Sequence, residues 1–196
     1  MPQTTEPTSA PPHVFHRLDR SASRPWTRRQ YAGRMLWYLV EISLFRLSLP
    51  RAYGWRRFLL RQFGAKMGIN SCVRRSVRIW HPWLLQMDAF SMLGDDVQVY
   101  NLGEFFIGQH SIVSQQTYIC AGTHDYTRIE LPLLREPVRI GHGVWIAAQA
   151  FIGPGVTIGD NSVIGARAVV VSDIAGGVVA AGNPARVIKP RTMQIG

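Results

Sequence analysis

The sequence has few cysteines, no long apolar run, and few acidic residues in its first 80 positions. Cys72 and Cys120 are too few for a disulfide framework in 196 residues, which favours a reducing compartment. The longest apolar stretch, residues 35–49, carries Glu41 and Arg46, whereas a membrane-spanning helix needs about 20 mostly apolar residues. The opening residues lack the basic-then-apolar pattern of a signal peptide. We therefore expect a cytoplasmic protein with no transmembrane span.

The positive charge is confined to the first part of the chain. Residues 1–80 contain 15 Lys and Arg but only 3 Asp and Glu, whereas residues 81–196 contain 7 and 9. No recognisable nucleic-acid-binding module accompanies this charge, so nucleic acid is not an expected partner. A basic segment rich in aromatic residues favours either a solvated capping layer or contact with an anionic membrane surface at the inner face of the membrane.

The chain divides into four segments by composition. Residues 1–25, rich in Pro, Ser and Thr, predict a flexible tail. Residues 26–65 predict a basic amphipathic helical segment, with helices over 34–49 and 54–62. In the first helix, one face carries Leu36, Leu39, Val40 and Leu47, and the opposite face carries Arg34, Tyr38, Glu41 and Ser48. Residues 66–175 form the main domain, and residues 176–196 form a closing segment.

The main domain shows an apolar residue at every sixth position. The clearest run consists of Ile140, Ile146, Ile152, Ile158, Ile164 and Val170, most of them followed by Gly or Ala. Upstream, the run continues in trios: Met67, Val73, Ile79; Met87, Leu93, Val99; Ile107, Val113, Ile119. Six-residue repeats with small turn residues are typical of a parallel β-helix, in which each hexad is one short strand and one turn.

The spacing between the trios predicts a triangular cross-section. Each trio keeps steps of six, and longer steps fall only between trios, which indicates three hexads per turn and insertions at one corner. An antiparallel sandwich would not keep this register in threes. We therefore predict about five triangular coils, with the N-terminal helices covering the open strand edges of the first coil and the segment after Val171 covering those of the last.

These stretches resemble the left-handed β-helix, hexapeptide-repeat acyltransferases. The resemblance covers about residues 30–190 and rests on VRIGHGVWIAAQAFIGPGVTIGDNSVIGARAVV, AAGNPARVIKP, GTHDY and GWRRFLLRQFGAKMG. Within this family, the chain is most similar to the colanic-acid and exopolysaccharide O-acetyltransferase branch. The resemblance implies left-handed coils, a homotrimer with active sites between subunits, acetyl-CoA as co-substrate, a sugar acceptor and no metal.

His124 is the candidate general base. It lies five residues after Ile119, at the start of the long insertion in the repeat, and insertions longer than a turn requires are often functional. The resemblance implies that the histidine of this THD segment removes the proton of the acceptor hydroxyl. The alternative is a solvated loop histidine. Asp125 either orients the imidazole or caps a turn, while His81, His110 and His142 are expected at turn positions that face water.

The acceptor-binding residues are less well matched to the family. The resemblance places polar acceptor-binding groups at positions that hold Trp80, Gly94 and Leu102 here, so these groups are missing. Asn101 and Asp96 lie nearby and are candidate substitutes, together with Asp125. The acceptor pocket is therefore expected to differ from that of related sugar acetyltransferases.

The resemblance implies a coenzyme A site in the groove between neighbouring subunits. The matching positions are Trp145, Ala148, Ala166, Val171, Ser172, Arg186 and Lys189. Small residues would let the pantetheine arm approach the backbone, and cations suit its phosphates. The alternatives are that Ala and Gly merely fill tight turns and that Trp145 is interface packing.

The leading hypothesis is an O-acetyltransferase that moves acetyl from acetyl-CoA to a sugar hydroxyl of an exopolysaccharide building block. Within the same chemistry, the alternative is acetylation of a small sugar or an antibiotic. A zinc-dependent β-helix carbonic anhydrase would need three converging histidines, but no two histidines here are five residues apart. A non-catalytic scaffold is the remaining alternative, and it predicts that His124→Ala changes nothing measurable.

Overall fold

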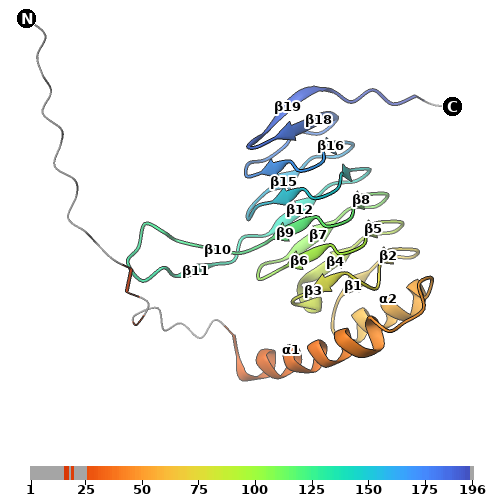
Figure 1. Cartoon of the computed structure of the whole chain (residues 1–196), viewed down its shortest axis with the longest axis vertical. Helices are drawn as coiled ribbons and strands as arrows, with labels where there is room; N and C mark the ends of the chain where they lie inside the picture. Colours follow the sequence, from red (N-terminus) through yellow and green to blue (C-terminus); the bar gives the residue numbers. More distant parts are fainter. Residues whose placement is uncertain (1–15, 18, 20–25, 195–196) are drawn as a thin grey trace, which may run out of the picture.

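The computed structural model describes residues 16–17, 19 and 26–194, so most of the predicted tail over residues 1–25 lies outside the described residues. The described chain forms a stack of coils with two helices at one end and a protruding arm at one side (Figure 1). Its main body is the predicted parallel β-helix with an N-terminal helical segment. Left-handedness, which the sequence suggests only through its resemblance, stays a prediction.

Short strands stack into three faces. Face 1 consists of β1 (Lys66–Met67), β4 (Leu85–Met87), β7 (Phe105–Ile107), β12 (Val138–Ile140) and β15 (Thr157–Ile158). Face 2 consists of β2 (Cys72–Val73), β5 (Met92–Leu93), β8 (Ile112–Val113), β13 (Trp145–Ile146), β16 (Val163–Ile164), β18 (Val178–Gly182) and β19 (Ala185–Pro190). Face 3 consists of β3 (Arg78–Ile79), β6 (Gln98–Tyr100), β9 (Tyr118–Cys120), β14 (Phe151–Ile152) and β17 (Val169–Val170).

The six-residue repeat fills the interior as predicted. All the repeated apolar residues from Met67 to Val170 are buried, and none exposes more than 8% of its surface. On face 1, Met67 pairs with Met87, which pairs with Ile107, so residues from successive turns lie directly above one another. Five turns run from β1 to β17, and a partial sixth turn begins where Ile174 bridges to Ile158. Burial of this continuous column is the main stabilising contribution to the coil stack.

The three corners of each coil differ in length. The first corner joins faces 1 and 2, and the second corner joins faces 2 and 3; both are tight turns in every coil. Each tight turn at the second corner, after the first coil, places one residue at positive φ: Asp96, Gln116, Gln149 and Arg167. The loop corner joins faces 3 and 1 and carries every insertion, including the 3-10 turn η3 (Pro82–Leu84) and the arm of residues 121–137. The predicted restriction of insertions to one corner is therefore confirmed.

The helices cover the open end of the first coil. They are α1 (Arg28–Val40), a π-helical continuation η2 (Glu41–Phe45), and α2 (Tyr53–Gln62), and they lie beneath β1, β2 and β3 in Figure 1. The predicted helix over 34–49 thus begins six residues earlier and changes to π geometry at Glu41. Thr27 caps α1 by accepting a hydrogen bond from the backbone NH of Gln30.

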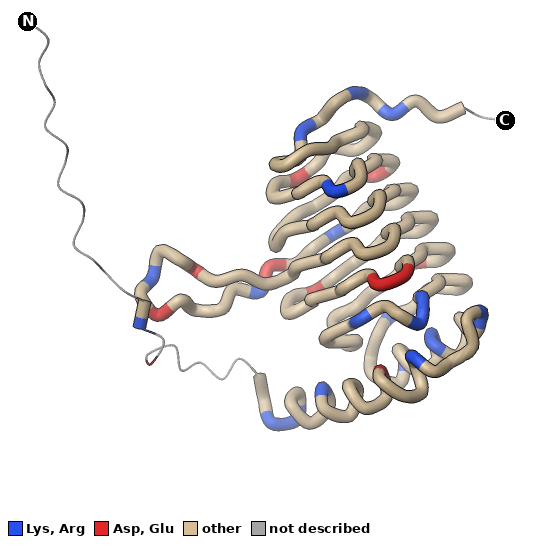
Figure 2. The backbone as a smooth tube through the Cα atoms, viewed as in Figure 1, with Lys and Arg blue, Asp and Glu red and all other residues tan. Residues whose placement is uncertain are grey.

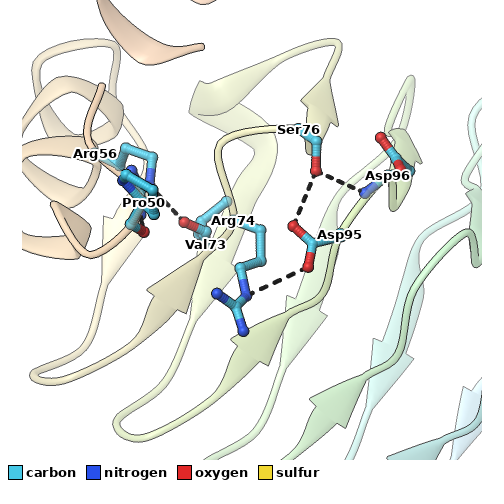
Figure 3. Close-up of polar contacts among 7 residues, drawn as sticks. All are labelled: Pro50, Arg56, Val73, Arg74, Ser76, Asp95 and Asp96. Atoms are coloured by element: carbon cyan, nitrogen blue, oxygen red, sulfur yellow. Dashed lines mark hydrogen bonds and ion pairs between the residues drawn. The ribbon is translucent and has the colours of Figure 1, made fainter. Parts of the chain in front are cut away.

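Side chains of the helices bind the backbone groups that the first coil leaves unpaired. Arg61 donates to the carbonyl oxygen of Met67 at 2.6 Å, and the Nε of Arg56 donates to that of Val73 at 2.6 Å (Figure 3). At the edge of β3, Ile79 donates its NH to the Glu41 carboxylate at 2.8 Å, and its carbonyl accepts from the Trp37 indole at 2.7 Å. Open strand edges promote unwanted pairing, and these contacts close the edges at all three faces.

The outward side of α1 and η2 is largely apolar, whereas Trp37 and Glu41 on the inward side bind the first coil. Of the four residues on the predicted apolar face, Val40 packs against the core, but Leu36, Leu39 and Leu47 expose 56%, 52% and 80% of their surface. At the other end of the stack, β18 pairs in parallel with β16 and then turns back to pair antiparallel with β19. Among the described residues, no helix is both long and apolar enough to cross a membrane.

Candidate active site

The arm at the loop corner carries the candidate general base. Two short antiparallel strands, β10 (Thr123–His124) and β11 (Leu133–Leu134), form its stem and hold it away from the coil stack (Figure 1). Thr123 is opposite Leu134, and His124 is opposite Leu133. His124 therefore lies in the stem itself, on a paired strand, with its side chain exposed.

The backbone of the arm fixes the tautomer of His124. The imidazole Nδ1 lies 2.7 Å from the carbonyl oxygen of Leu131. A carbonyl can only accept a hydrogen bond, so Nδ1 carries the proton in the neutral ring and Nε2 keeps a free lone pair. Leu131 itself has a φ of 47°, a conformation that is uncommon outside glycine and clusters at functional sites. The arrangement presents Nε2 as a proton acceptor.

The Asp125 carboxylate caps a turn, and among the residues that the structure describes it makes no hydrogen bond to the His124 imidazole. Its carboxylate accepts hydrogen bonds from the backbone NH of Thr127 at 3.0 Å and from the Thr127 hydroxyl at 2.6 Å. These hydrogen bonds lower the pKa of the Asp125 carboxyl. Of the two roles left open by the sequence, the structure supports turn capping, and the Leu131 carbonyl takes the place of an orienting group.

Asn101 is buried at the loop corner, one coil before the arm. Its side-chain amide donates to the His81 carbonyl at 2.7 Å and accepts from the His81 NH at 3.0 Å. With both amide atoms engaged and no exposed surface, Asn101 is the candidate acceptor-binding residue that the structure supports least. Its hydrogen bonds instead join two successive coils below the arm.

The expected exposure of His81 is wrong. The residue exposes 1% of its surface, its Nδ1 lies 2.9 Å from the Asn101 carbonyl oxygen, and the Trp26 ring stacks on it at 4.4 Å. The guanidinium of Arg135, at the end of the arm, lies 4.0 Å from the centre of the same Trp26 ring. Trp26 therefore packs between the loop corner and the base of the arm, a contact that the sequence does not signal because it joins distant residues.

Asp96 lies at a different corner from His124. It occupies the second corner, where its backbone NH donates to the Ser76 hydroxyl at 2.9 Å (Figure 3). The neighbouring Asp95 accepts from the same hydroxyl at 3.2 Å and lies 3.6 Å from the Arg74 guanidinium. Asp95 is thus engaged in holding the corner, whereas the exposed Asp96 carboxylate points away from it. Within one chain, the structure does not bring Asp96 and His124 together.

A groove on face 2 brings two of the candidate donor-binding residues together. Trp145 and Lys189 line a hollow of about 430 Å³, together with Val163, Val179, Pro190, Arg191 and Thr192. The Trp145 indole, 48% exposed, donates to the Ser114 hydroxyl at 3.0 Å. Arg191 also lines this groove and is not predicted from the sequence, although it lies only two residues after Lys189. Its guanidinium donates to the Gly143 carbonyl at 2.8 Å.

The other candidate donor-binding residues lie at two corners. Ala148 and Ala166 stand at the second corner in successive coils, whereas Val171 and Ser172 follow β17 at the loop corner. Arg186 is exposed on β19, and its guanidinium donates to the Ala185 carbonyl. Within a single chain, the predicted donor-binding residues therefore lie on face 2 and at both corners of face 3. Among the described residues, no group of three or more His, Cys, Asp or Glu is arranged to hold a metal ion.

Similarity to known proteins agrees with the repeat and with the whole fold. The profile of the family "Bacterial transferase hexapeptide (six repeats)" matches residues 137–172. A protein of Escherichia coli K12 assigned as the colanic acid biosynthesis acetyltransferase WcaF is 46% identical over 156 residues, which cover 80% of this chain and 86% of that protein.

Two solved structures have a similar fold. A galactoside acetyltransferase in complex with coenzyme A has a TM-score of 0.77 and 28% identity, over 85% of this chain and 84% of that one. A hexapeptide-repeat acetyltransferase of Vibrio cholerae O1 biovar eltor, complexed with acetyl coenzyme A, has a TM-score of 0.78 and 25% identity, over 85% and 91% of the two chains.

Proposed function

Because the chain belongs to the hexapeptide-repeat acetyltransferases, we propose that it transfers acetyl from acetyl-CoA to a hydroxyl of a sugar in an exopolysaccharide building block, with His124 as general base. The observation that carries the proposal is the hydrogen bond between His124 Nδ1 and the Leu131 carbonyl, which leaves Nε2 free to accept a proton. The 46% identical relative, assigned to colanic acid biosynthesis, supports the class of acceptor.

The proposed reaction needs one proton acceptor that later acts as a donor. His124 Nε2 removes the hydroxyl proton while the sugar oxygen attacks the thioester carbonyl carbon. The carbon–sulfur bond then breaks, and the imidazolium returns the proton to the departing coenzyme A thiolate. The products are the O-acetyl sugar and coenzyme A with a free thiol. The Leu131 carbonyl can accept from Nδ1–H in both protonation states of the ring, so it holds the imidazole in one orientation throughout the reaction.

The donor site proposed for this chain combines the groove on face 2 with the corner residues. Trp145 offers an apolar surface, while Lys189, Arg191 and Arg186 offer cations for the phosphates of coenzyme A. Ala148 and Ala166 leave room beside the backbone at the second corner, and Val171 and Ser172 complete the site at the loop corner. Neighbours of similar fold that contain coenzyme A or acetyl coenzyme A support a donor of this kind.

A homotrimer with sites between subunits is the proposed assembly. The outer side of face 1 carries Lys66, Gln86, Phe106 and Arg139, and that of face 3 carries Arg78 and Gln98. Face 3 also bears a column of half-buried aromatic rings, with centroids 5.2–6.3 Å apart: Trp80, Tyr100, Tyr118 and Phe151. An aromatic column of this kind favours packing against another subunit. Such packing would also bring the arm of one subunit near the donor residues of another.

The acceptor is proposed to lie beside the arm, where Asp96 of an adjoining subunit and Asp125 remain the candidate polar contacts. We also propose that the enzyme works in the cytoplasm, where acetyl-CoA is available. The absence of polar side chains at Trp80, Gly94 and Leu102 favours an acceptor that differs from those of related sugar acetyltransferases.

A free-thiol assay tests the proposal directly. Purified protein is incubated with acetyl-CoA and a panel of nucleotide sugars and oligosaccharides, with chloramphenicol included to test the antibiotic alternative. We expect thiol release that depends on one sugar class, and a loss of about 10²–10⁴-fold in turnover for His124→Ala. The matched control is His110→Ala, which removes an exposed histidine at the first corner. Equal turnover in the two variants would contradict a catalytic role for His124 and favour a scaffold.

A further inference from the structure

The outer surface of the helical layer is apolar, and no residue among those that the structure describes covers it. Along the side of α1 and η2 that faces away from the coils, Tyr31, Met35, Leu39 and Ile42 expose 44–64% of their surface, and Leu49 exposes 77%. Contiguous apolar patches are rare on soluble monomers and mark interaction sites. The inward side of the same helix is fixed by Trp37 and Glu41 on the first coil, so the helix cannot roll over to bury its apolar side.

The same layer is strongly basic and has no exposed acid. Residues 26–66 contain nine Lys and Arg and one acidic residue, Glu41, which is buried against Ile79. Figure 2 shows the Lys and Arg positions spread along the helices. Arg28, Arg29 and Arg51 are exposed, and they stand at either end of the apolar row. The surface therefore combines apolar side chains with an uncompensated positive charge.

We propose that this surface, defined by the exposed apolar and arginine residues of 28–51, binds in the plane of an anionic lipid bilayer. Apolar residues flanked by arginines suit the boundary between acyl chains and negatively charged headgroups. Trp55 and Phe58 of α2, stacked at 5.7 Å and both exposed, add aromatic rings of the kind enriched at that boundary. A second copy of the chain is less suited to the surface, because two such layers would place arginines against arginines.

The position of the layer favours a planar partner. The helices lie across the end of the coil stack (Figure 1), so their outer side faces along the stack rather than sideways toward faces 1, 2 and 3. Neighbours packed against a lateral face would leave this end free. A groove of about 540 Å³ beside α1 and α2, lined by Leu36, Phe63 and Trp83 with Arg29, adjoins the apolar row through Leu36 and adds apolar surface at the same end.

Vesicle co-sedimentation of the full chain tests the proposal. We expect binding to phosphatidylcholine vesicles that contain about one third phosphatidylglycerol, and much weaker binding to pure phosphatidylcholine. Raising sodium chloride from about 0.1 M to about 0.5 M should reduce the binding, because salt screens the headgroup charge. Binding that is absent, or equal on the two kinds of vesicle, would overturn the proposal.

Two sets of variants separate the apolar and charged contributions. Met35→Gln with Leu39→Gln and Ile42→Gln removes exposed side chains and should weaken binding by about tenfold or more. The control set is Val187→Gln, Ile188→Gln and Met193→Gln, similarly exposed at the other end of the chain, and it should bind as the unmodified protein does. Arg28→Gln with Arg29→Gln and Arg51→Gln should weaken binding by roughly fivefold per arginine.

Light scattering, which measures the oligomeric mass, tests whether a second copy of the chain covers the same surface instead of a bilayer. If the first set lowers the oligomeric mass in solution and leaves vesicle binding unchanged, the apolar row is an interface between copies of this chain and the bilayer proposal is wrong. If vesicle binding falls while the mass stays constant, the proposal is supported. The outcome is independent of thiol release, so failure of membrane binding and failure of the proposed catalytic role can be distinguished.

Discussion

Two histidines of this chain make the same hydrogen bond but differ in what they can do. The Nδ1 atoms of His124 and His81 each lie within 2.9 Å of a backbone carbonyl oxygen, from Leu131 and Asn101 respectively. His124 is exposed on the arm, whereas His81 exposes 1% of its surface beneath Trp26. The sequence places both after a strand of face 3. It distinguishes them only through the length of the insertion at His124, because the packing of Trp26 depends on residues far apart in the chain.

The buried histidine predicts a loss of stability in acid. Burial, followed by the nearby charges of Arg34 and Arg135, lowers the pKa of His81 from 6.5 to about 4. Between these values the unfolded chain binds a proton that the folded chain excludes, so the free energy of unfolding falls as the pH decreases from about 6.5 to about 4. The full effect is about 3 kcal/mol, and it is absent above pH 6.5.

Urea unfolding at several pH values measures this effect. His81→Phe keeps an aromatic ring against Trp26 but cannot titrate, so its stability should be lower at pH 7 and should depend less on pH between 4 and 6.5. His110→Phe, at an exposed position, should retain the pH dependence of the unmodified protein. Parallel pH profiles for the protein and His81→Phe would show that His81 does not cause the loss.

At the level of elements, the six-residue repeat predicts the coils correctly. The apolar periodicity of the helical layer does not predict which side of the helix is buried. The strands and corners are predictable because each buried position recurs with fixed spacing and aligns with its counterpart in the next turn. In the first helical segment, the sequence groups Leu36, Leu39, Val40 and Leu47 on one face, but only Val40 packs against the core and the three leucines point outward. The reason is specific to the first coil, whose unpaired backbone groups at Ile79 bind the polar Glu41 and the Trp37 indole.

The contact between Glu41 and Ile79 leads to a prediction about hydrogen bonding and charge in the helical layer. Burial raises the pKa of the Glu41 carboxyl, which lies within hydrogen-bond distance of the Ile79 NH. Glu41→Gln keeps an oxygen for that NH and removes the buried charge, so it should be as stable as the protein at pH 7 or more so. Glu41→Leu leaves the NH without an acceptor and should cost about 1–3 kcal/mol.

Thermal and urea unfolding of the two variants at pH 7 distinguish these contributions. Equal destabilisation by Gln and Leu would mean that the attraction of the charged carboxylate to Arg46 and Arg78 outweighs its hydrogen bond, contrary to the prediction. Leu39→Gln provides a matched control on the outer side of the same helix, where the side chain is exposed. It should leave the stability nearly unchanged.

The whole molecule places its candidate catalytic and donor-binding groups on different surfaces. His124 projects at the loop corner, whereas Trp145 and Lys189 line the groove on face 2. In the proposed homotrimer, the arm of one subunit would reach the groove of another and complete a site made from both. The position of His124 at the long insertion singles it out, and the family resemblance points to Trp145 and Lys189. Neither gives their separation, because the direction of the arm depends on the pairing of β10 with β11.

Mixed oligomers test whether the site is shared between subunits. His124→Ala removes the base, and Trp145→Ala with Lys189→Ala weakens the donor groove, so each variant alone should have little activity. In a trimer assembled at random from equal amounts of the two, about a quarter of the sites would combine an intact arm with an intact groove. We therefore expect thiol release to recover to about that fraction after co-expression, but not after the preformed oligomers are mixed without exchange. No recovery in verified mixed trimers would indicate that each chain builds its site alone, which the separation of His124 from the groove makes difficult.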